Sequence, residues 1–224
     1  MWAADLRPAG PPALASPPRG EAASRAHGAG APADGAAGWG GPVVYEVTGE
    51  SAADVAAVMG PDGDLVAPRL ARGARCFAAR LGREVVAFGW LSTDSEWIGE
   101  VELEISPGPD EAYIWNCATH PDHRRKGFFR AIVNGIAAQA RTEGKKRLWI
   151  GSLDIPAAKA VAQNGFVPAI HFTSVWMYGM RWLRVRPAAG VDLSLELAAR
   201  EVLSVGGRPL RLGSSMKRAE RRRH

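Results

Sequence analysis

The chain has 224 residues, of which 46% are hydrophobic and 23% are charged, a composition typical of a globular protein that buries a core. No stretch approaches the roughly 18 apolar residues of a membrane-spanning helix, and the first 41 residues lack the basic start and compact apolar run of a secretory signal. Only two cysteines, Cys76 and Cys117, are present, which excludes a disulfide framework and offers no metal-ligand spacing. We therefore expect a cytoplasmic protein with no membrane association and no metal site.

The formal net charge of +5 is concentrated at the C-terminus. Between residues 217 and 223 the chain carries five basic residues and only one acidic residue, which gives this tail a charge of +4 and leaves +1 for the rest. Such a tail can contact phosphates, but short basic runs are more often solvated. Because no helix-turn-helix, zinc-finger or ribonucleoprotein aromatic motif accompanies it, nucleic-acid binding is not expected.

Composition divides the chain into three parts. Residues 1–41 are dominated by Ala, Gly and Pro and do not contain enough apolar surface to offset the entropy of ordering, so we predict a disordered arm or an over-extended start of translation. Residues 42–186 carry patterned elements and are predicted to form one folded domain. Residues 187–224 are weakly patterned and form a C-terminal extension that ends in the basic tail.

The first half of the domain is rich in predicted strands. In chain order, strands are expected over 42–47, 75–81, 84–91, 100–105 and 112–119, with a short helix after Ser51. Gly82-Arg83 is the turn of a hairpin between the second and third of these strands. The strict alternation of Glu with apolar residues over 100–105 is typical of a half-buried strand.

In the second half of the domain, the spacing of the apolar residues changes from a strand pattern to a helix pattern. From Gly127 onward, apolar residues recur every four positions, which predicts an amphipathic helix that ends near Gly144. A strand over 147–152, a helix over 156–164, and two paired strands over 167–178 and 181–186 follow. The whole order predicts an α/β fold in which helices pack on a mixed sheet.

The loop between the strand 112–119 and this helix is basic. The first N–H groups of a helix have no internal partner and its dipole adds partial positive charge. Arg124, Arg125 and Lys126 add three formal charges, and Gly127 lets an anion approach the main chain closely. This arrangement suits a pyrophosphate; the alternative is a solvated basic turn.

Two motifs make the chain resemble the GNAT superfamily of N-acetyltransferases over about residues 43–178. The loop pattern of this family is Arg or Gln, two residues, Gly, one residue, then Gly or Ala, and Arg124 and Gly127 match it after the sequence His120-Pro121-Asp122. Phe129 departs from the last position, which puts the size of the diphosphate pocket in question. The later family signature is an Asn followed at a fixed distance by Gly-Phe, and the stretch from Asp154 to Gly165-Phe166 keeps that spacing.

The resemblance implies a mixed sheet that is splayed open after the strand 112–119, the fourth long strand of the domain. Acetyl-CoA or another acyl-CoA would lie in the gap. The pantetheine arm would pair with the main chain of Cys117, Ala118 and Thr119, with the acyl carbonyl near Thr119. The diphosphate would bind main-chain amides of the loop and helix start, namely those of Arg124, Arg125, Lys126, Gly127, Phe128 and Phe129. Asp154 stands in place of the signature Asn and would serve as a helix cap.

The resemblance leaves the proton transfers open. Many members carry a Tyr that protonates the leaving thiolate, and Val161 occupies that position here. Some relatives that acetylate histones place a catalytic Glu where this chain has Tyr113, which would act through a water or be a packed strand residue. Asn116 is a polar residue within a predicted buried strand, and either orients a substrate or bonds to a neighbouring element.

The sequence therefore predicts an N-acyltransferase whose partners are coenzyme A and a small primary amine, and a homodimer is one assembly compatible with it. Val161 motivates a second interpretation, a non-catalytic acyl-CoA-binding or sensor domain. A third is a protein N-acetyltransferase in which the N-terminal arm and the basic tail help to dock the substrate.

Overall fold

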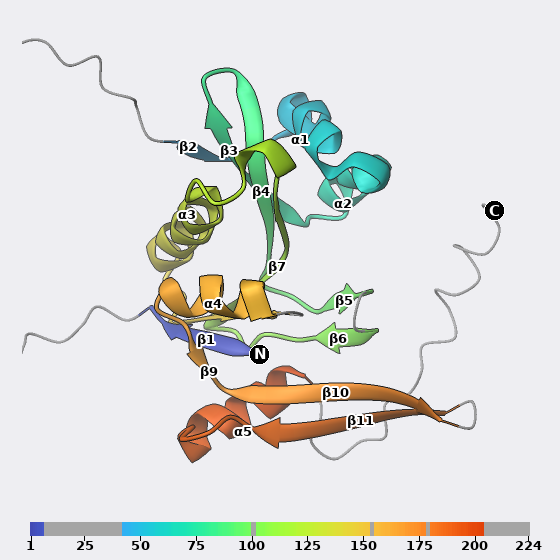
Figure 1. Cartoon of the computed structure of the whole chain (residues 1–224), viewed down its shortest axis with the longest axis vertical. Coiled ribbons are helices and arrows are strands. Elements are labelled where there is room, and N and C mark those ends of the chain that lie inside the picture. The colour runs from blue at the N-terminus through green and yellow to red at the C-terminus, as the bar shows by residue number, and fades with distance from the viewer. Residues whose placement is uncertain (7–41, 100–101, 153–154, 178–179, 204–224) are drawn as a thin grey trace, which may run out of the picture.

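In a computed structural model of the chain, the strands form a mixed sheet with helices on both faces (Figure 1). The structure describes residues 1–6, 42–99, 102–152, 155–177 and 180–203. The strands are β1 (Trp2–Asp5), β2 (Val43–Glu46), β3 (Arg75–Leu81), β4 (Glu84–Ser92), β5 (Glu96–Ile98), β6 (Leu103–Ile105), β7 (Glu111–Thr119), β8 (Arg147–Ile150), β9 (Val167–Pro168), β10 (Ile170–Met177) and β11 (Met180–Pro187). The α-helices are α1 (Ala52–Met59), α2 (Val66–Ala71), α3 (Phe128–Thr142), α4 (Ile155–Gln163) and α5 (Leu193–Val202), and a short 3-10 helix spans Pro121–His123.

The main sheet has the strand order β2-β3-β4-β7-β8-β1-β9. All neighbouring strands in it are antiparallel except β7 and β8, which run parallel. The predicted hairpin of β3 and β4 is confirmed, with Leu81 opposite Glu84 across the turn. The α/β fold class with a mixed sheet and flanking helices is therefore confirmed.

Two further hairpins stand apart from the main sheet. β10 and β11 pair from Ile170 opposite Pro187 to Met177 opposite Met180, as the sequence predicted. β5 and β6 pair over three residues each. The strand predicted over 100–105 is shorter than expected, because β6 covers only Leu103–Ile105 and Glu102 lies in a turn with a φ of 46°.

The two faces of the sheet carry separate hydrophobic clusters. Helix α3 lies on one side of β4 while α1 and α2 lie on the other (Figure 1). On the first face, Ile132 and Ile136 of α3 are buried in the cluster with the strand residue Ile114. On the other face, Val55 of α1 is buried in the cluster with Trp90. The apolar residues that recur every four positions in α3 thus form the helix face that packs on the sheet.

Strand β1 corrects the expectation that all of residues 1–41 form a disordered arm. β1 lies between β8 and β9, with Trp2 opposite Ile150 and Ala3 opposite Trp149. Leu6 N donates to Lys146 O at 2.9 Å, and Ala169 N donates to Met1 O at 3.0 Å, so both ends of the strand are held. The arm prediction is wrong for residues 1–6, because the side chains of Met1, Ala3 and Leu6 are buried. Residues 7–41 lie outside those that the structure describes.

The C-terminal extension packs on the domain through α5. Asp192 caps this helix by accepting from Ser194 N at 3.1 Å. Ala199 and Val202 are buried in the cluster that also contains Trp90, and Ser106 N donates to Val202 O at 2.8 Å. The basic tail after residue 203 lies outside the described residues. Among the described helices, none is long and apolar enough to cross a membrane.

The position of β1 predicts that a charge at Ala3 destabilises the protein. Ala3 is 2% exposed within the sheet, so Ala3→Asp would bury a carboxylate without a partner. We expect a loss of at least about 2 kcal/mol, which for a chain of this size lowers the melting temperature by roughly 4–8 °C. Thermal unfolding followed by circular dichroism measures the change.

The matched control for this substitution is Val43→Asp. Val43 also lies in a strand, the edge strand β2, and is 55% exposed. The same charge there should leave the melting temperature nearly unchanged. Equal melting temperatures for the two variants would show that β1 does not contribute to the folded core.

Candidate active site

The candidate site begins where β7 loses its neighbour β8. The two strands pair only from Glu111 opposite Arg147 to Ile114 opposite Ile150. β8 ends at Ile150, whereas β7 continues to Thr119. A cavity of about 270 Å³ lies at this opening, and its lining includes residues of β7, α3 and α4. The opening is the splay that the sequence analysis expected after the fourth long strand.

A β-bulge shapes the wall of this cavity. In the β4–β7 ladder, Phe88 lies opposite Ala118 and Trp90 opposite Trp115, so two residues of β7 face Gly89 alone. The two residues are Asn116 and Cys117, which both line the cavity. Asn116 has a φ of 43°, a conformation that is costly for most residues and that Asn tolerates better than most. The residue with the strained backbone, Asn116, is therefore part of the cavity wall.

Gly89 is required by the bulge. A Cβ atom at this position would lie 2.7 Å from the Cys117 sulfur and 2.9 Å from Ile132 Cγ2. The thiol of Cys117 thus points toward α3, and burial raises its pKa to about 12. A thiol that stays protonated at neutral pH is a poor nucleophile, so the role expected for Cys117 rests on its main chain.

The basic loop has the geometry of an anion-binding site. Arg125 and Gly127 have φ values of 63° and 87°, and Arg124 Nε donates to Thr119 O at 3.4 Å, which folds the loop onto the end of β7. No described residue accepts a hydrogen bond from the main-chain N–H groups of residues 125–129. The Arg124 N–H is already bonded to Pro121 O at 3.3 Å, so the free amides begin one residue later than expected.

Electrostatics around these amides favour an anion. The first turn of α3 contains no acidic residue, and the helix is 15 residues long, so its dipole is not offset there. The side chains of Arg124, Arg125 and Lys126 are exposed beside it. A Cβ at Gly127 would meet nothing within 4 Å, so the space above the loop is open. The requirement for glycine at this position comes from its φ of 87°.

Only some of the predicted site residues line the same cavity. Tyr113, Asn116, Cys117 and Phe129 line one cavity, whereas Ala118 and Thr119 continue β7 toward the basic loop. The side chain of Phe128 is buried in the cluster between α3 and the sheet, so only its amide is available to a ligand. Asp154 lies outside the described residues.

Val161 and Tyr113 contribute to the same cavity. Val161 on α4 and Tyr113 on β7 both line it, and they are 1% and 5% exposed. The Tyr113 hydroxyl lies 2.8 Å from the position that a Cβ on Gly151 would occupy, just beyond the end of β8. Among the described residues that line the cavity, Tyr113 is the one tyrosine, and Val161 stands where many family members carry a Tyr.

Sequence reasoning missed the apolar part of the cavity. Ile98, Ile105, Phe172 and Leu203 also line it, from β5, β6, β10 and the end of α5. Each belongs to a short or separate element, and no local motif links them to the basic loop. Only their apolar character, which is shared with any core residue, was visible in the sequence.

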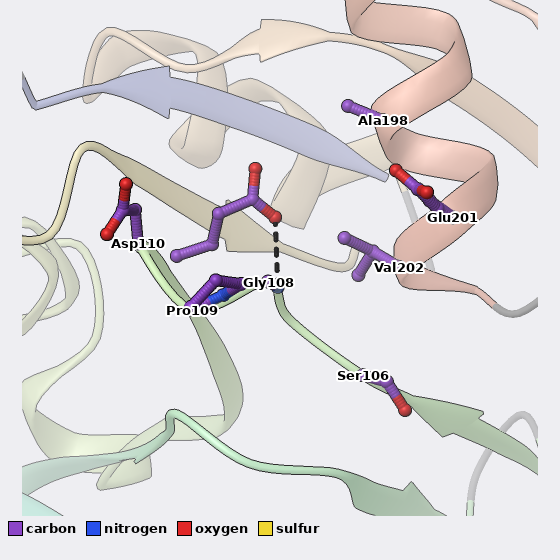
Figure 2. A pocket seen from close by; sticks show the side chains of 8 residues that line it. Ser106, Gly108, Pro109, Asp110, Ala198, Glu201 and Val202 are labelled. Atoms are coloured by element: carbon purple, nitrogen blue, oxygen red, sulfur yellow. Dashed lines mark hydrogen bonds between the residues drawn. The ribbon is translucent and has the colours of Figure 1, made fainter.

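A second cavity, of about 250 Å³, lies between the turn before β7 and helix α5 (Figure 2). Its most buried carboxylate, that of Glu111, accepts hydrogen bonds from Gly108 N at 3.3 Å, Trp149 Nε1 at 2.8 Å and Arg147 Nη1 at 3.0 Å. Asp110 is paired with Lys146 at 2.6 Å. The acidic lining and its place at the opposite end of β7 separate this cavity from the basic loop.

Comparisons with known proteins found solved structures that are similar to part of this chain. Solved structures with similar folds include the ribosomal-protein-alanine N-acetyltransferase of Brucella melitensis biovar Abortus 2308, at 20% identity and a TM-score of 0.43 over 55% of this chain and 89% of that chain. The ribosomal-protein-S18-alanine N-acetyltransferase of Escherichia coli shares 18% identity, at a TM-score of 0.45 over 58% and 80%. An aminoglycoside acetyltransferase from an uncultured soil metagenomic sample shares 12%, at 0.43 over 55% and 86%.

Sequence comparison is more decisive. No curated protein sequence matches the chain. The family model described as the acetyltransferase (GNAT) family matches residues 55–166, a segment that covers half of the chain and contains β7, the basic loop, α3 and α4. The chain therefore belongs to the GNAT acetyltransferase family.

Proposed function

We propose that this chain is an N-acyltransferase that moves an acetyl group, or another acyl group, from coenzyme A to a primary amine of a small molecule. The observation that carries the proposal is the continuity between two features: the free amides of residues 125–129 and the cavity at the bulge of β7. The amides suit a diphosphate and the cavity suits a thioester. The end of β7 at Ala118 and Thr119, which does not pair with β8, joins the two.

In the proposed complex, the coenzyme A diphosphate binds the amides at the start of α3, beside the Arg125 and Lys126 side chains. The pantetheine arm follows β7 through the opening left by β8, where its amide groups pair with strand main chain. The thioester then reaches the bulge at Asn116. Catalysis is mainly positioning: the amine and the thioester carbonyl are held together in a site that is largely shielded from water.

Tyr113 is the residue we assign to proton transfer. When the amine attacks the carbonyl carbon, the carbon–sulfur bond breaks and the thiolate takes up a proton. An unperturbed phenol has a pKa of about 10, so it is protonated at neutral pH and is a better acid than base. Val161 has no proton to donate, so we assign this role to Tyr113, which lines the same cavity. The proton of the attacking amine leaves through water.

A binding or sensor domain is the second candidate function, and Val161 is the observation that favours it. A coenzyme A thiol is an acceptable leaving group, with an ordinary pKa of about 8.5, so the missing family Tyr slows the reaction without forbidding it. Turnover separates the two functions. We expect the release of free thiol from acetyl-CoA to rise when a library of small primary amines is added. Binding of acetyl-CoA with no amine-dependent release would favour the sensor.

Gly127→Glu should weaken coenzyme A binding strongly. A carboxylate about 4 Å from a phosphate costs roughly 1–4 kcal/mol. This penalty corresponds to a dissociation constant that is about 5- to 10³-fold higher, measured by isothermal titration calorimetry.

Gly73→Glu is the matched control for this variant. Gly73 has a φ of 88° against 87° for Gly127, and a Cβ at either position meets nothing within 4 Å, so both variants carry the same strain and charge. Gly73 lies in the turn between α2 and β3, away from the cavity. Unchanged affinity in Gly127→Glu, or an equal loss in both variants, would contradict the loop assignment.

Tyr113→Phe should lower kcat with little change in coenzyme A affinity. A general acid contributes about 10²–10⁴-fold, and this range bounds the expected loss in steady-state thiol-release assays. Adding Val161→Tyr to Tyr113→Phe should restore part of the rate, because it places a phenol on the facing helix. Overpacking limits the recovery at a cost of about 1–3 kcal/mol of stability.

Tyr45→Phe serves as the control, since Tyr45 lies on β2 and does not line the cavity. Its kcat should equal that of the wild type. A Tyr113→Phe enzyme that is folded, binds coenzyme A and turns over at the wild-type rate would remove Tyr113 from the mechanism.

A further inference from the structure

Three side chains with metal-ligating atoms meet beside the basic loop. Glu84 is the first residue of β4, His120 follows the last residue of β7, and His123 ends the 3-10 helix before the loop. One ligand atom from each of the three lies within 4.8 Å of the others. Glu84 comes from the β3–β4 hairpin, so the cluster is assembled by the fold and has no motif in the sequence.

The backbone holds the two histidines in place. His120 N donates to Val86 O at 2.8 Å, which fixes this residue against β4 two positions after Glu84. His123 N donates to His120 O at 2.9 Å, so the chain turns back and brings the second imidazole over the first, with ring centroids 5.8 Å apart. The His123 ring also packs edge-on against Phe128. Both rings are therefore positioned before any ligand binds.

One pair of donor atoms already has the spacing of two ligands on one metal ion. His123 Nε2 and Glu84 Oε1 lie 3.3 Å apart. Tetrahedral zinc with bonds of about 2.0–2.2 Å places its ligand atoms about 3.4 Å apart. Asp122 Oδ2 lies 3.8 Å from His120 Nδ1, where a carboxylate can orient a metal-bound imidazole from outside the coordination sphere.

The environment of the cluster also favours an ion. The Glu84 side chain is 59% exposed, which leaves an entry path and lets the carboxylate adjust its distance to an incoming ion.

We propose that Glu84, His120 and His123 bind one divalent transition-metal ion, with zinc as the preferred ion. Two imidazoles and one carboxylate match the preference of Zn²⁺ for nitrogen and oxygen ligands, and solvent supplies the fourth. The bound ion connects the β3–β4 turn to the segment that leads into the anion-binding loop. The site is independent of acyl transfer, because it uses none of the residues that line the cavity.

The test is zinc titration by isothermal titration calorimetry on the full chain, made without a histidine tag and stripped with a chelator. We expect one Zn²⁺ per chain with a micromolar or lower dissociation constant. Glu84→Gln and His123→Gln should each raise that constant by at least about 10-fold. Zn²⁺ should also raise the melting temperature of the wild type but not that of Glu84→Gln.

The control is His171→Gln, because His171 is an exposed histidine on β10, outside the cluster. Its zinc affinity should equal that of the wild type. Glu84→Gln changes an exposed side chain, so it tests the site even if His123→Gln fails to fold. The proposal is overturned if the wild type binds no stoichiometric zinc, if Glu84→Gln binds as tightly as the wild type, or if His171→Gln loses as much affinity.

Discussion

The candidate site depends on one loss of strand pairing, the point after Ile114 where β7 continues and β8 does not. Main-chain N–H and C=O groups at such an edge need partners, because leaving them buried and unpaired costs as much as a lost hydrogen bond. A molecule with its own amide groups can supply those partners, and pantetheine is such a molecule. In the proposed complex, the opening between β7 and β8 is where pantetheine pairs with the main chain of β7.

The bulge at Asn116 shows how the fold maintains this opening. An inserted residue bends β7 locally, and two neighbours accommodate it: Gly89, which leaves space for the Cys117 sulfur, and Ile132, which packs against the same spot from α3. A non-glycine residue in the left-handed region costs of order 1–3 kcal/mol and persists only when its surroundings enforce it. The buried face of α3 therefore supports the shape of the cavity wall as well as the core.

Much of this architecture could be predicted from the sequence, because the decisive signals are local. The spacing of Ile132 and Ile136 gives the period of α3, and the loop residues Arg124 and Gly127 mark its start. The family and the fold class follow from such signals, whereas β1, α2, β5 and α5 were not predicted.

What could not be predicted is long-range or geometric. Nothing in the sequence around Asn116 distinguishes a bulge from a regular strand, and nothing links Phe172 or Leu203 to the cavity that they line. Glu84 reaches the two histidines only through the β3–β4 hairpin.

The place of β1 between β8 and β9 has a consequence for how the protein is made. Its residues are synthesised well before those of β8 and β9, yet Ala3 pairs with Trp149 and Val167. Closing so long a loop costs entropy before any contact repays it, and folds dominated by distant contacts form slowly. The half of the sheet beyond β7 therefore cannot be completed during most of translation. Until β9 emerges, the first strand and the β8 edge that receives it stay exposed, and this is the interval in which the nascent chain depends most on protection from aggregation.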